Sequence, residues 1–190
     1  MPSATPLKLA AAIIECIDAG ARVINLSIAL AQASAKGEQA LEEALDQALR
    51  RGVLIVAAAG NQGTLGSSAI TRHPWVIPVM ACDLSGRPMN ESNLGSSIGR
   101  RGLSAPGDSI TSLGSQGQPL TLGGTSVAVP FVTGAIALLW SEFPAATTAQ
   151  IKLAITQATT LRRASVVPPL LDAAAAYQIL LTANARRQIA

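Results

Sequence analysis

Apolar residues recur along this chain with two different periods, and the alternation between them predicts an α/β fold. Residues 5–19 carry apolar side chains at helical spacing and end at Gly20, a residue suited to the left-handed position after a helix. The runs VINLSI (23–28) and VLIVAAA (53–59) are almost continuously apolar, which is typical of parallel strands covered by helices on both faces. With the helical segment 37–51 between them, they predict a βαβ unit.

The remainder of the chain continues the sheet and then turns helical. A third apolar run covers residues 75–82, and the Gly/Ser/Asn/Pro-rich stretch 83–124 predicts loops with short strands. Three further helices are expected, at 125–142, 147–158 and 170–181. No internal repeat or linker divides the sequence. We therefore expect one domain over residues 1–190, with a three-layer helix/parallel sheet/helix architecture.

Composition agrees with a sizeable buried core and argues against several classes of function. Of the 190 residues, 49% are hydrophobic and 13% charged, which favours a globular domain over a disordered or fibrous chain. The net charge of +3 is scattered in short arginine pairs, so binding of nucleic acid is not indicated. The apolar run 127–140 is too short to span a bilayer and contains a proline, so no membrane segment is expected. Nothing at the N-terminus resembles a signal peptide, and the compartment stays open.

The sequence also predicts no metal and no cofactor. Cys16 and Cys82 lie far apart without metal-site or redox spacing, and both are expected to be small core residues. A single histidine and two isolated cysteines cannot make a usual zinc set. The glycines of segment 60–66 follow GxxGxxG rather than GxGxxG, and residues 67–74 are too few for the crossover helix of a dinucleotide site.

Two segments carry residues suited to acyl-transfer chemistry. In GGTSVAVPFVTGAIALLW (123–140) two glycines precede Ser126 at the start of a buried helix, where unpaired N–H groups and the helix dipole stabilise negative charge. Ser126 is therefore a candidate nucleophile, although serine and threonine also commonly cap helices. AAAGNQG (57–63) ends a buried strand and puts Asn61 at the carboxyl edge of the sheet. An amide there is a suitable oxyanion donor.

Four segments together resemble the subtilisin family of serine peptidases, in sequence and in order. GARVINLSIAL (20–30) resembles the strand whose far end lines the family's substrate cleft, and VLIVAAAGNQG (53–63) resembles its oxyanion-asparagine segment. LSAPG (103–107) looks like the Ala-Pro-Gly loop, and GGTSVAVPFVTGAIALL (123–139) looks like the nucleophile helix. The resemblance covers nearly the whole chain and implies the C-terminal part of a subtilisin-like catalytic domain, lacking the N-terminal part.

The resemblance implies roles for five residues. Ser126 falls on the catalytic serine, and its backbone N–H together with Asn61 Nδ2 would hold the oxyanion. Ser27, Ile28 and Ala29 would flank a bound peptide or protein substrate. Bound calcium is common in the family, but no ligand cluster for it can be named in this sequence.

The chain departs from the family pattern in packing and in chemistry. Val127 stands where Met is usual and Phe131 where His is usual, which should adjust the packing beneath the nucleophile. The family's Asp-Thr-Gly and His-Gly-Thr segments do not occur in this sequence. The single histidine, His73, lies elsewhere in the order of motifs and is expected at the surface or a strand edge, while Asp83 and Asp108 lie in segments typical of Asx-turns. Without a base, the chain alone should be nearly inactive.

Two functions remain open at this point. One is a portion of a serine endopeptidase that works through an acyl-serine intermediate, with Asp and His supplied by an N-terminal segment or a second chain. The other is a catalytically dead pseudopeptidase that binds an extended peptide by strand addition to an open edge over residues 23–30.

Overall fold

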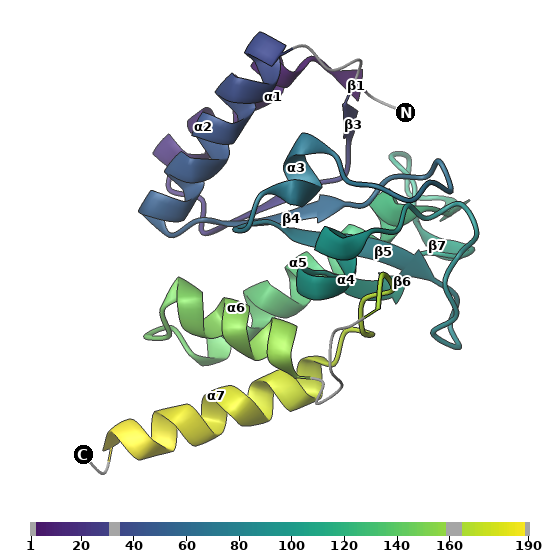
Figure 1. Ribbon diagram of the computed structural model, residues 1–190. Helices are drawn as coiled ribbons and strands as arrows, with labels where there is room; N and C mark the ends of the chain where they lie inside the picture. Colours follow the sequence, from purple (N-terminus) through teal and green to yellow (C-terminus); the bar gives the residue numbers. More distant parts are fainter. Residues whose placement is uncertain (1–2, 31–34, 159–164, 189–190) are drawn as a thin grey trace.

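A parallel β-sheet forms the centre of the computed structural model, which describes residues 3–30, 35–158 and 165–188 (Figure 1). Its strands lie in the order β2-β4-β5-β6, and each adjacent pair is parallel. The strands are β2 (Val23–Leu26), β4 (Leu54–Ala58), β5 (Ile77–Cys82) and β6 (Leu103–Pro106). The parallel sheet expected from the apolar runs is confirmed.

Helices cover both faces of this sheet, as Figure 1 shows. On one face lie α1 (Pro6–Asp18), α2 (Ala35–Arg51) and the short α3 (Ala69–Arg72). On the other face lie α5 (Thr125–Glu142), α6 (Thr148–Gln157) and α7 (Ala173–Gln188). The three-layer α/β architecture is confirmed.

Two pairs of short strands lie outside the central sheet. β1 (Ser3–Ala4) pairs in parallel with β3 (Ala29–Leu30), and β7 (Ile110–Leu113) forms an antiparallel hairpin with β8 (Pro119–Leu122). The expectation of an open edge over residues 23–30 is therefore wrong at one end. Within the described part of the chain, β2 has a neighbour on one side alone, but Ala29 and Leu30 are paired with β1. A pairing of two residues leaves no pattern in the sequence.

The sheet divides the core into two clusters of buried side chains. Along β4, Leu54 and Val56 belong to the cluster under α5 and α6, whereas Ile55 and Ala57 belong to the cluster under α1 and α2. All four are at most 1% exposed. A strand with helices on both faces needs apolar side chains at every position, which is why these runs show no alternation.

The cluster under α6 yields a stability prediction with a matched control on the same helix. Ile155 is fully buried, whereas Leu153 is 51% exposed. We expect Ile155→Ala to lower the free energy of unfolding by about 2–5 kcal/mol, because it removes buried methyl groups and leaves a cavity. Leu153→Ala should change it by about 0.5 kcal/mol or less. Urea denaturation followed by circular dichroism measures both, and equal losses would contradict this packing of α6.

The helix that carries Ser126, α5, is strongly apolar. Its length and composition alone would suffice to cross a membrane, the one helix among the described residues for which this holds. Yet much of it packs into the core, where the buried residues are Thr125, Ala128, Val129, Val132, Ala135, Ile136, Leu139 and Trp140. The apolar composition is accounted for by this burial against the sheet.

Three local features differ from the sequence expectation. Cys82 is buried in β5, but Cys16 is exposed on α1, so only one cysteine is a core residue. The stretch expected to hold loops and short strands also contains α4 (Ser96–Arg101). The last helix begins three residues later than expected, because the chain before it runs extended beside β6, where Leu171 N donates to Ser104 O at 2.8 Å.

Candidate active site

Ser126 is the second residue of α5, and two glycines, Gly123 and Gly124, directly precede the helix. Gly124 has a φ of 117°, a conformation that glycine adopts far more readily than other residues. A Cβ at Gly124 would lie 2.6 Å from Nδ2 of Asn61, closer than any side chain could tolerate. The glycine therefore lets the Asn61 side chain approach the start of α5, and the structure brings together the two residues that sequence analysis singled out.

The side chain of Asn61 is oriented by the hydrogen bonds that its amide oxygen accepts. Oδ1 accepts hydrogen bonds from the backbone N–H of Thr125 at 2.9 Å and from Thr125 Oγ1 at 2.8 Å. The Thr125 hydroxyl oxygen in turn accepts from the Gly60 N–H at 3.2 Å. These contacts join the turn after β4 to the helix start and leave Nδ2 without a hydrogen-bond partner among the described residues.

The backbone N–H of Ser126 is a second donor without a partner in the described part of the chain. The N–H of Thr125, the preceding residue, donates to Asn61. The N–H groups of Val127 and Ala128, the next two residues, donate to the carbonyl oxygen of Gly124 at 3.0 and 3.3 Å. N–H groups in the first turn of a helix have no carbonyl of the same helix to bind. Two unpaired donors therefore lie at the positive end of α5, an arrangement able to stabilise an oxyanion.

The hydroxyl of Ser126 lies against the carboxyl end of β2. Ser126 Oγ donates to Ser27 O at 3.4 Å, and Ser27 Oγ donates to Ser126 O at 2.9 Å. Asn25 donates to Ser27 Oγ at 2.8 Å and accepts from Thr133 Oγ1 at 3.0 Å, which links β2 to the third turn of α5. Sequence analysis missed Asn25 and Thr133. A polar residue within the apolar run VINLSI is the one sign that could have pointed to Asn25.

The three residues expected to flank substrate occupy different surroundings. Ser27 contacts Ser126 directly. Ile28 is partly buried and packs against the core cluster under α1 and α2. Ala29 pairs through its backbone with Ser3 of β1. Their part in substrate binding stays a prediction.

Asn93 organises the turn that carries Asn61, and sequence analysis missed it. Its Oδ1 accepts from the backbone N–H groups of Gln62 and Thr64 at 3.0 and 3.1 Å and from Thr64 Oγ1 at 3.1 Å. Its Nδ2 donates to Ala59 O at 3.2 Å and to Gln62 Oε1 at 2.7 Å. One amide side chain thus makes five hydrogen bonds to the residues on either side of Asn61. These partners are some 30 positions away in the chain, so no local pattern could reveal them.

Removing this side chain should loosen the turn after β4. We expect Asn93→Ala to speed up hydrogen exchange of the Gln62 and Thr64 amides by about tenfold or more, since each lost hydrogen bond is worth about 0.5–1.5 kcal/mol. Asn93→Asp keeps the Oδ1 acceptor and should retain most of the protection. NMR-detected exchange measures both variants. Unchanged exchange in Asn93→Ala would show that Asn93 does not hold the turn.

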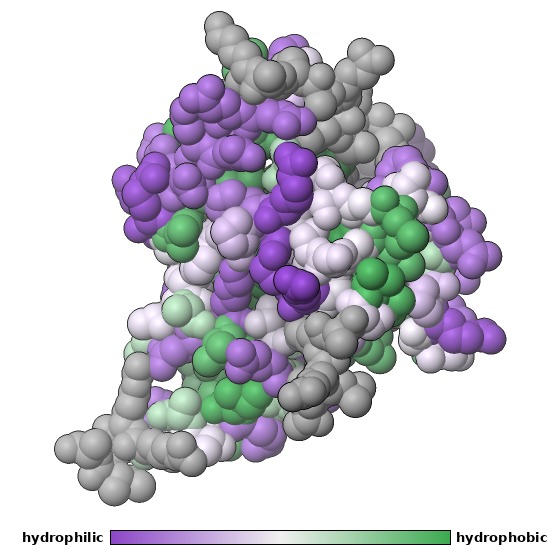
Figure 2. All heavy atoms as spheres, viewed as in Figure 1, coloured by the Kyte–Doolittle hydropathy of each residue, from purple (hydrophilic) through white to green (hydrophobic). Residues whose placement is uncertain are grey.

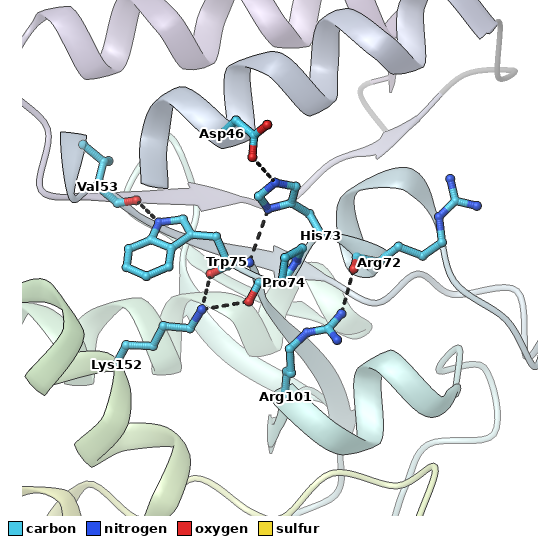
Figure 3. A network of polar contacts seen from close by, with 8 residues as sticks. All are labelled: Asp46, Val53, Arg72, His73, Pro74, Trp75, Arg101 and Lys152. Carbon is cyan, nitrogen blue, oxygen red and sulfur yellow. Dashed lines mark hydrogen bonds and ion pairs between the residues drawn. The ribbon is translucent and has the colours of Figure 1, made fainter. Parts of the chain in front are cut away.

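His73 and Ser126 lie at opposite ends of the strands of the sheet. It follows α3 and precedes β5, so it is at the amino end of the strands, whereas Ser126 lies beside the carboxyl end of β2. Figure 3 shows its ring between Asp46, 3.1 Å from Nε2, and the Trp75 N–H, which donates to Nδ1 at 3.3 Å. At 8% exposure the residue is buried, so of the two expected positions, the surface or a strand edge, the surface is wrong. Both ring nitrogens are occupied in this pairing, away from the candidate nucleophile.

Of the two aspartates considered as acids, Asp83 holds a turn, as its sequence context predicts. Asp83 accepts from the backbone N–H groups of Ser85 at 2.8 Å and Arg87 at 2.9 Å and from Arg87 Nε at 2.7 Å. The Arg87 N–H and then the Arg87 side chain lower the pKa of Asp83 below its usual range. Asp108 accepts from Ser109 Oγ at 3.0 Å in an exposed turn. In the part of the chain that the structure describes, no group of three or more His, Cys, Asp or Glu side chains could hold a metal ion.

A hollow of about 490 Å³ opens beside Ser126, between the β7–β8 hairpin and the first turns of α5. Its lining consists of Ile110, Thr111, Ser112, Leu122, Ser126, Val127, Pro130 and Phe131. Phe131 is 42% exposed, so it does not pack beneath the nucleophile as expected. The reason is the helix period: Ala128, Val129 and Val132 face the sheet, and Val127 and Phe131 therefore face the hollow.

Comparison with known proteins decides the family. The sequence profile of the Subtilase family, peptidase S8, matches residues 2–179. This chain belongs to the subtilase family. A thermostable alkaline protease of Halalkalibacterium halodurans is 36% identical to this subtilase chain over 138 residues, covering 73% of the chain and 36% of the protease. Subtilisin DY of Bacillus licheniformis is 35% identical over 137 residues, covering 70% of the chain and 47% of the subtilisin. The subtilase chain thus spans about a third to a half of the length of these curated relatives.

Solved structures agree with the subtilisin-like fold. The prenylagaramide maturation protease PagA superposes with a TM-score of 0.82 at 28% identity, over 93% of this subtilase chain and 68% of PagA. The patellamide maturation protease PatA gives 0.80 at 31% identity, over 94% of this chain and 70% of PatA. The PatG macrocyclase domain gives 0.81 at 26% identity, over 94% of this chain and 57% of that domain. The expected fold and family are both confirmed.

Proposed function

We propose that this chain is the nucleophile-bearing portion of a subtilisin-like serine endopeptidase. The observation that carries the proposal is the placement of Ser126 in the first turn of α5, with two unpaired donors at hand: its own N–H and Asn61 Nδ2. Membership of the subtilase family supports the same chemistry. The substrate class is a peptide or protein.

In the proposed reaction Ser126 Oγ attacks the scissile carbonyl carbon while a base removes the hydroxyl proton. The carbonyl π electrons move onto the oxygen, which accepts hydrogen bonds from Asn61 Nδ2 and the Ser126 N–H. Collapse of the tetrahedral intermediate breaks the C–N bond, and the base returns the proton to the leaving amine. Water then hydrolyses the acyl-serine by the same steps in reverse order.

The base and its acidic partner are proposed to come from an N-terminal segment or from a second chain. Two surfaces support this. The edge of β2 that faces away from β4 has no neighbour among the described strands, and a strand added there in parallel would end beside Ser27, and hence beside Ser126. An apolar groove of about 590 Å³ also lies between α5 and α7, where Leu138 is 69% exposed. Relatives such as PagA, of which this chain covers 68%, have further residues that could fill such places.

A pseudopeptidase that binds peptides is the second candidate, and one observation favours it. The Ser126 hydroxyl donates to a backbone carbonyl, Ser27 O, rather than to a basic side chain. A serine without a base is a poor nucleophile. In this case the site would retain a peptide without cleaving it.

Labelling with a fluorophosphonate probe, read out by mass spectrometry of the modified residue, separates the two. We expect no labelling of the chain alone, and labelling of Ser126 once the chain is fused to the Asp- and His-bearing segment of a related subtilase. A Ser126→Ala fusion is the control for site assignment. A folded fusion that takes up no probe would contradict the peptidase proposal and favour the binding module.

A further inference from the structure

A proline alters the hydrogen bonding of α5 at the candidate nucleophile. Pro130 lies inside the helix, whose first residue is Thr125. In a regular α-helix each backbone N–H donates to the carbonyl oxygen four residues earlier, so residue 130 would donate to Ser126 O. Proline has no N–H, and its ring crowds that same carbonyl group. The Ser126 carbonyl therefore lacks the donor that a helix normally provides four residues later.

The hydroxyl of Ser27 provides a donor in its place. Ser27 follows the last residue of β2, and its Oγ donates to Ser126 O at 2.9 Å, across 99 positions of the chain. Both residues are partly buried, and a carbonyl left without a donor there would be costly. This contact therefore does for the Ser126 carbonyl what an N–H at position 130 would do in a regular helix.

Two more side chains direct the Ser27 hydroxyl. Asn25 Nδ2 donates to Ser27 Oγ at 2.8 Å, so the Ser27 oxygen accepts one hydrogen bond while its own proton points to Ser126 O. Thr133 Oγ1 donates to Asn25 Oδ1 at 3.0 Å and also lies 3.2 Å from Val129 O. The contact with Asn25 Oδ1 keeps the amide nitrogen of Asn25 on the side of Ser27. We call these three side chains, Thr133, Asn25 and Ser27, the polar relay.

The polar relay is built from neutral groups. Figure 2 shows a stripe of strongly hydrophilic side chains over the region of α3 and α4. The relay, by contrast, consists of two hydroxyls and one amide, none of which is charged near neutral pH. Salt screens interactions between charges. The relay should therefore hold Ser126 equally well at low and at high ionic strength.

We propose that Ser27 is a positioning residue for the nucleophile, and that Asn25 and Thr133 orient it. The carbonyl, the N–H and the side chain of Ser126 meet around one Cα, so a carbonyl held by Ser27 also restricts how Oγ and the N–H point. A displacement of about 1 Å near the reacting groups can cost about 10²-fold in rate. The hydrogen bond is independent of the proposed peptidase function, and its effect on rate rests on that function.

A double-mutant cycle on the chain itself tests the hydrogen bond. Pro130 is exposed, and Pro130→Ala returns an N–H that can donate to Ser126 O. We expect Ser27→Ala to raise the equilibrium constant of unfolding about fivefold in the parent chain, but less than about twofold beside Pro130→Ala. The carbon chemical shift of the Ser126 carbonyl should change in Ser27→Ala and return towards the parent value in the double variant. Urea denaturation and NMR measure the two effects.

Ser141→Ala is the matched control for this cycle. Ser141 Oγ also donates to a carbonyl oxygen of α5, Leu138 O at 2.7 Å, but the residue four positions after Leu138 is Glu142, which has an N–H. The effect of Ser141→Ala should therefore be the same with and without Pro130→Ala. An equal effect of Ser27→Ala in both backgrounds, or an unchanged carbonyl shift at Ser126, would overturn the proposal.

The effect on rate is measured in the domain completed by the Asp- and His-bearing segment of a related subtilase. We expect Ser27→Ala to lower kcat about tenfold or more and to change KM less than about twofold, because the nucleophile is displaced and the substrate is not. Ser27→Thr keeps a hydroxyl and should retain most of the activity. A rise in KM with kcat unchanged would make Ser27 a substrate contact and overturn its positioning role. A folded parent domain without activity would instead contradict the peptidase proposal, while the cycle on the chain still decides the hydrogen bond.

Discussion

Replacing Ser126 with alanine in the domain completed by an Asp- and His-bearing segment is expected to lower kcat by about 10⁵–10⁶-fold, close to the loss known for the nucleophile of a subtilisin. The variant lacks the atom that forms the acyl bond, so only oxyanion stabilisation and substrate binding remain. The fold should be little affected, because the hydroxyl makes one weak contact, with Ser27 O at 3.4 Å. We expect a change of about 1 kcal/mol or less in the free energy of unfolding.

The matched control for this variant lies on the same helix. Ser141 is exposed near the end of α5, and its Oγ donates to Leu138 O at 2.7 Å. Ser141→Ala should leave kcat within about twofold of the parent, because it is remote from the helix start that holds the donors. Hydrolysis of a chromogenic peptide measures both variants. Retention of activity by Ser126→Ala would mean that another residue is the nucleophile.

Replacing Asn61 should slow the reaction without weakening substrate binding to a similar extent. For Asn61→Ala we expect a loss of about 10²–10³-fold in kcat, or about 2.7–4 kcal/mol in the barrier, which is the magnitude known for the oxyanion asparagine of subtilisin. KM should change little, because the oxyanion exists only in the transition state and the intermediate. Asn61→Ala also removes the acceptor for the Thr125 N–H, which should lower the free energy of unfolding by about 1 kcal/mol.

Asn61→Asp separates these two effects. An aspartate keeps an Oδ1 acceptor for the backbone and hydroxyl groups of Thr125, and a negative charge at a helix N-terminus is favourable. It lacks the Nδ2 donor, so kcat should fall at least as far as in Asn61→Ala while the stability is retained. Full activity in both variants would exclude Asn61 from oxyanion stabilisation. If kcat falls only in the variant that loses stability, the role of Asn61 is to hold the start of the helix and not to stabilise the oxyanion.

Elements with a strong local pattern were predicted closely. The helix at Thr125–Glu142 has the predicted bounds, and the strands at Leu54–Ala58 and Ile77–Cys82 lie within the predicted runs. Continuous apolar runs between amphipathic helices leave few alternatives to a covered parallel sheet. The short helix Ser96–Arg101 and the pairing of Ser3–Ala4 with Ala29–Leu30 were missed, because segments of two to six residues carry little periodicity.

The candidate site was only partly accessible from the sequence. Ser126 and Asn61 could be found, because each stands at the end of a strongly patterned element and matches a family motif. The contacts that orient them could not be found in this way. Asn93 reaches Gln62 across 31 positions, and Thr133 reaches Asn25 across 108. Polar side chains of this kind look like ordinary loop or helix residues until the chain is folded.

The sequence by itself determined the family, the layered fold and the two residues with the clearest chemistry. These depend on local order: hydrophobic period, glycine placement and short motifs. The tertiary structure decided which donors stay unpaired around Ser126, that His73 faces Asp46 at the opposite end of the strands, and that Ser27 donates to the carbonyl oxygen of Ser126. Hydrogen bonding and burial depend on which distant segments meet, and in a parallel sheet that is settled by the crossover connections rather than by any stretch of sequence.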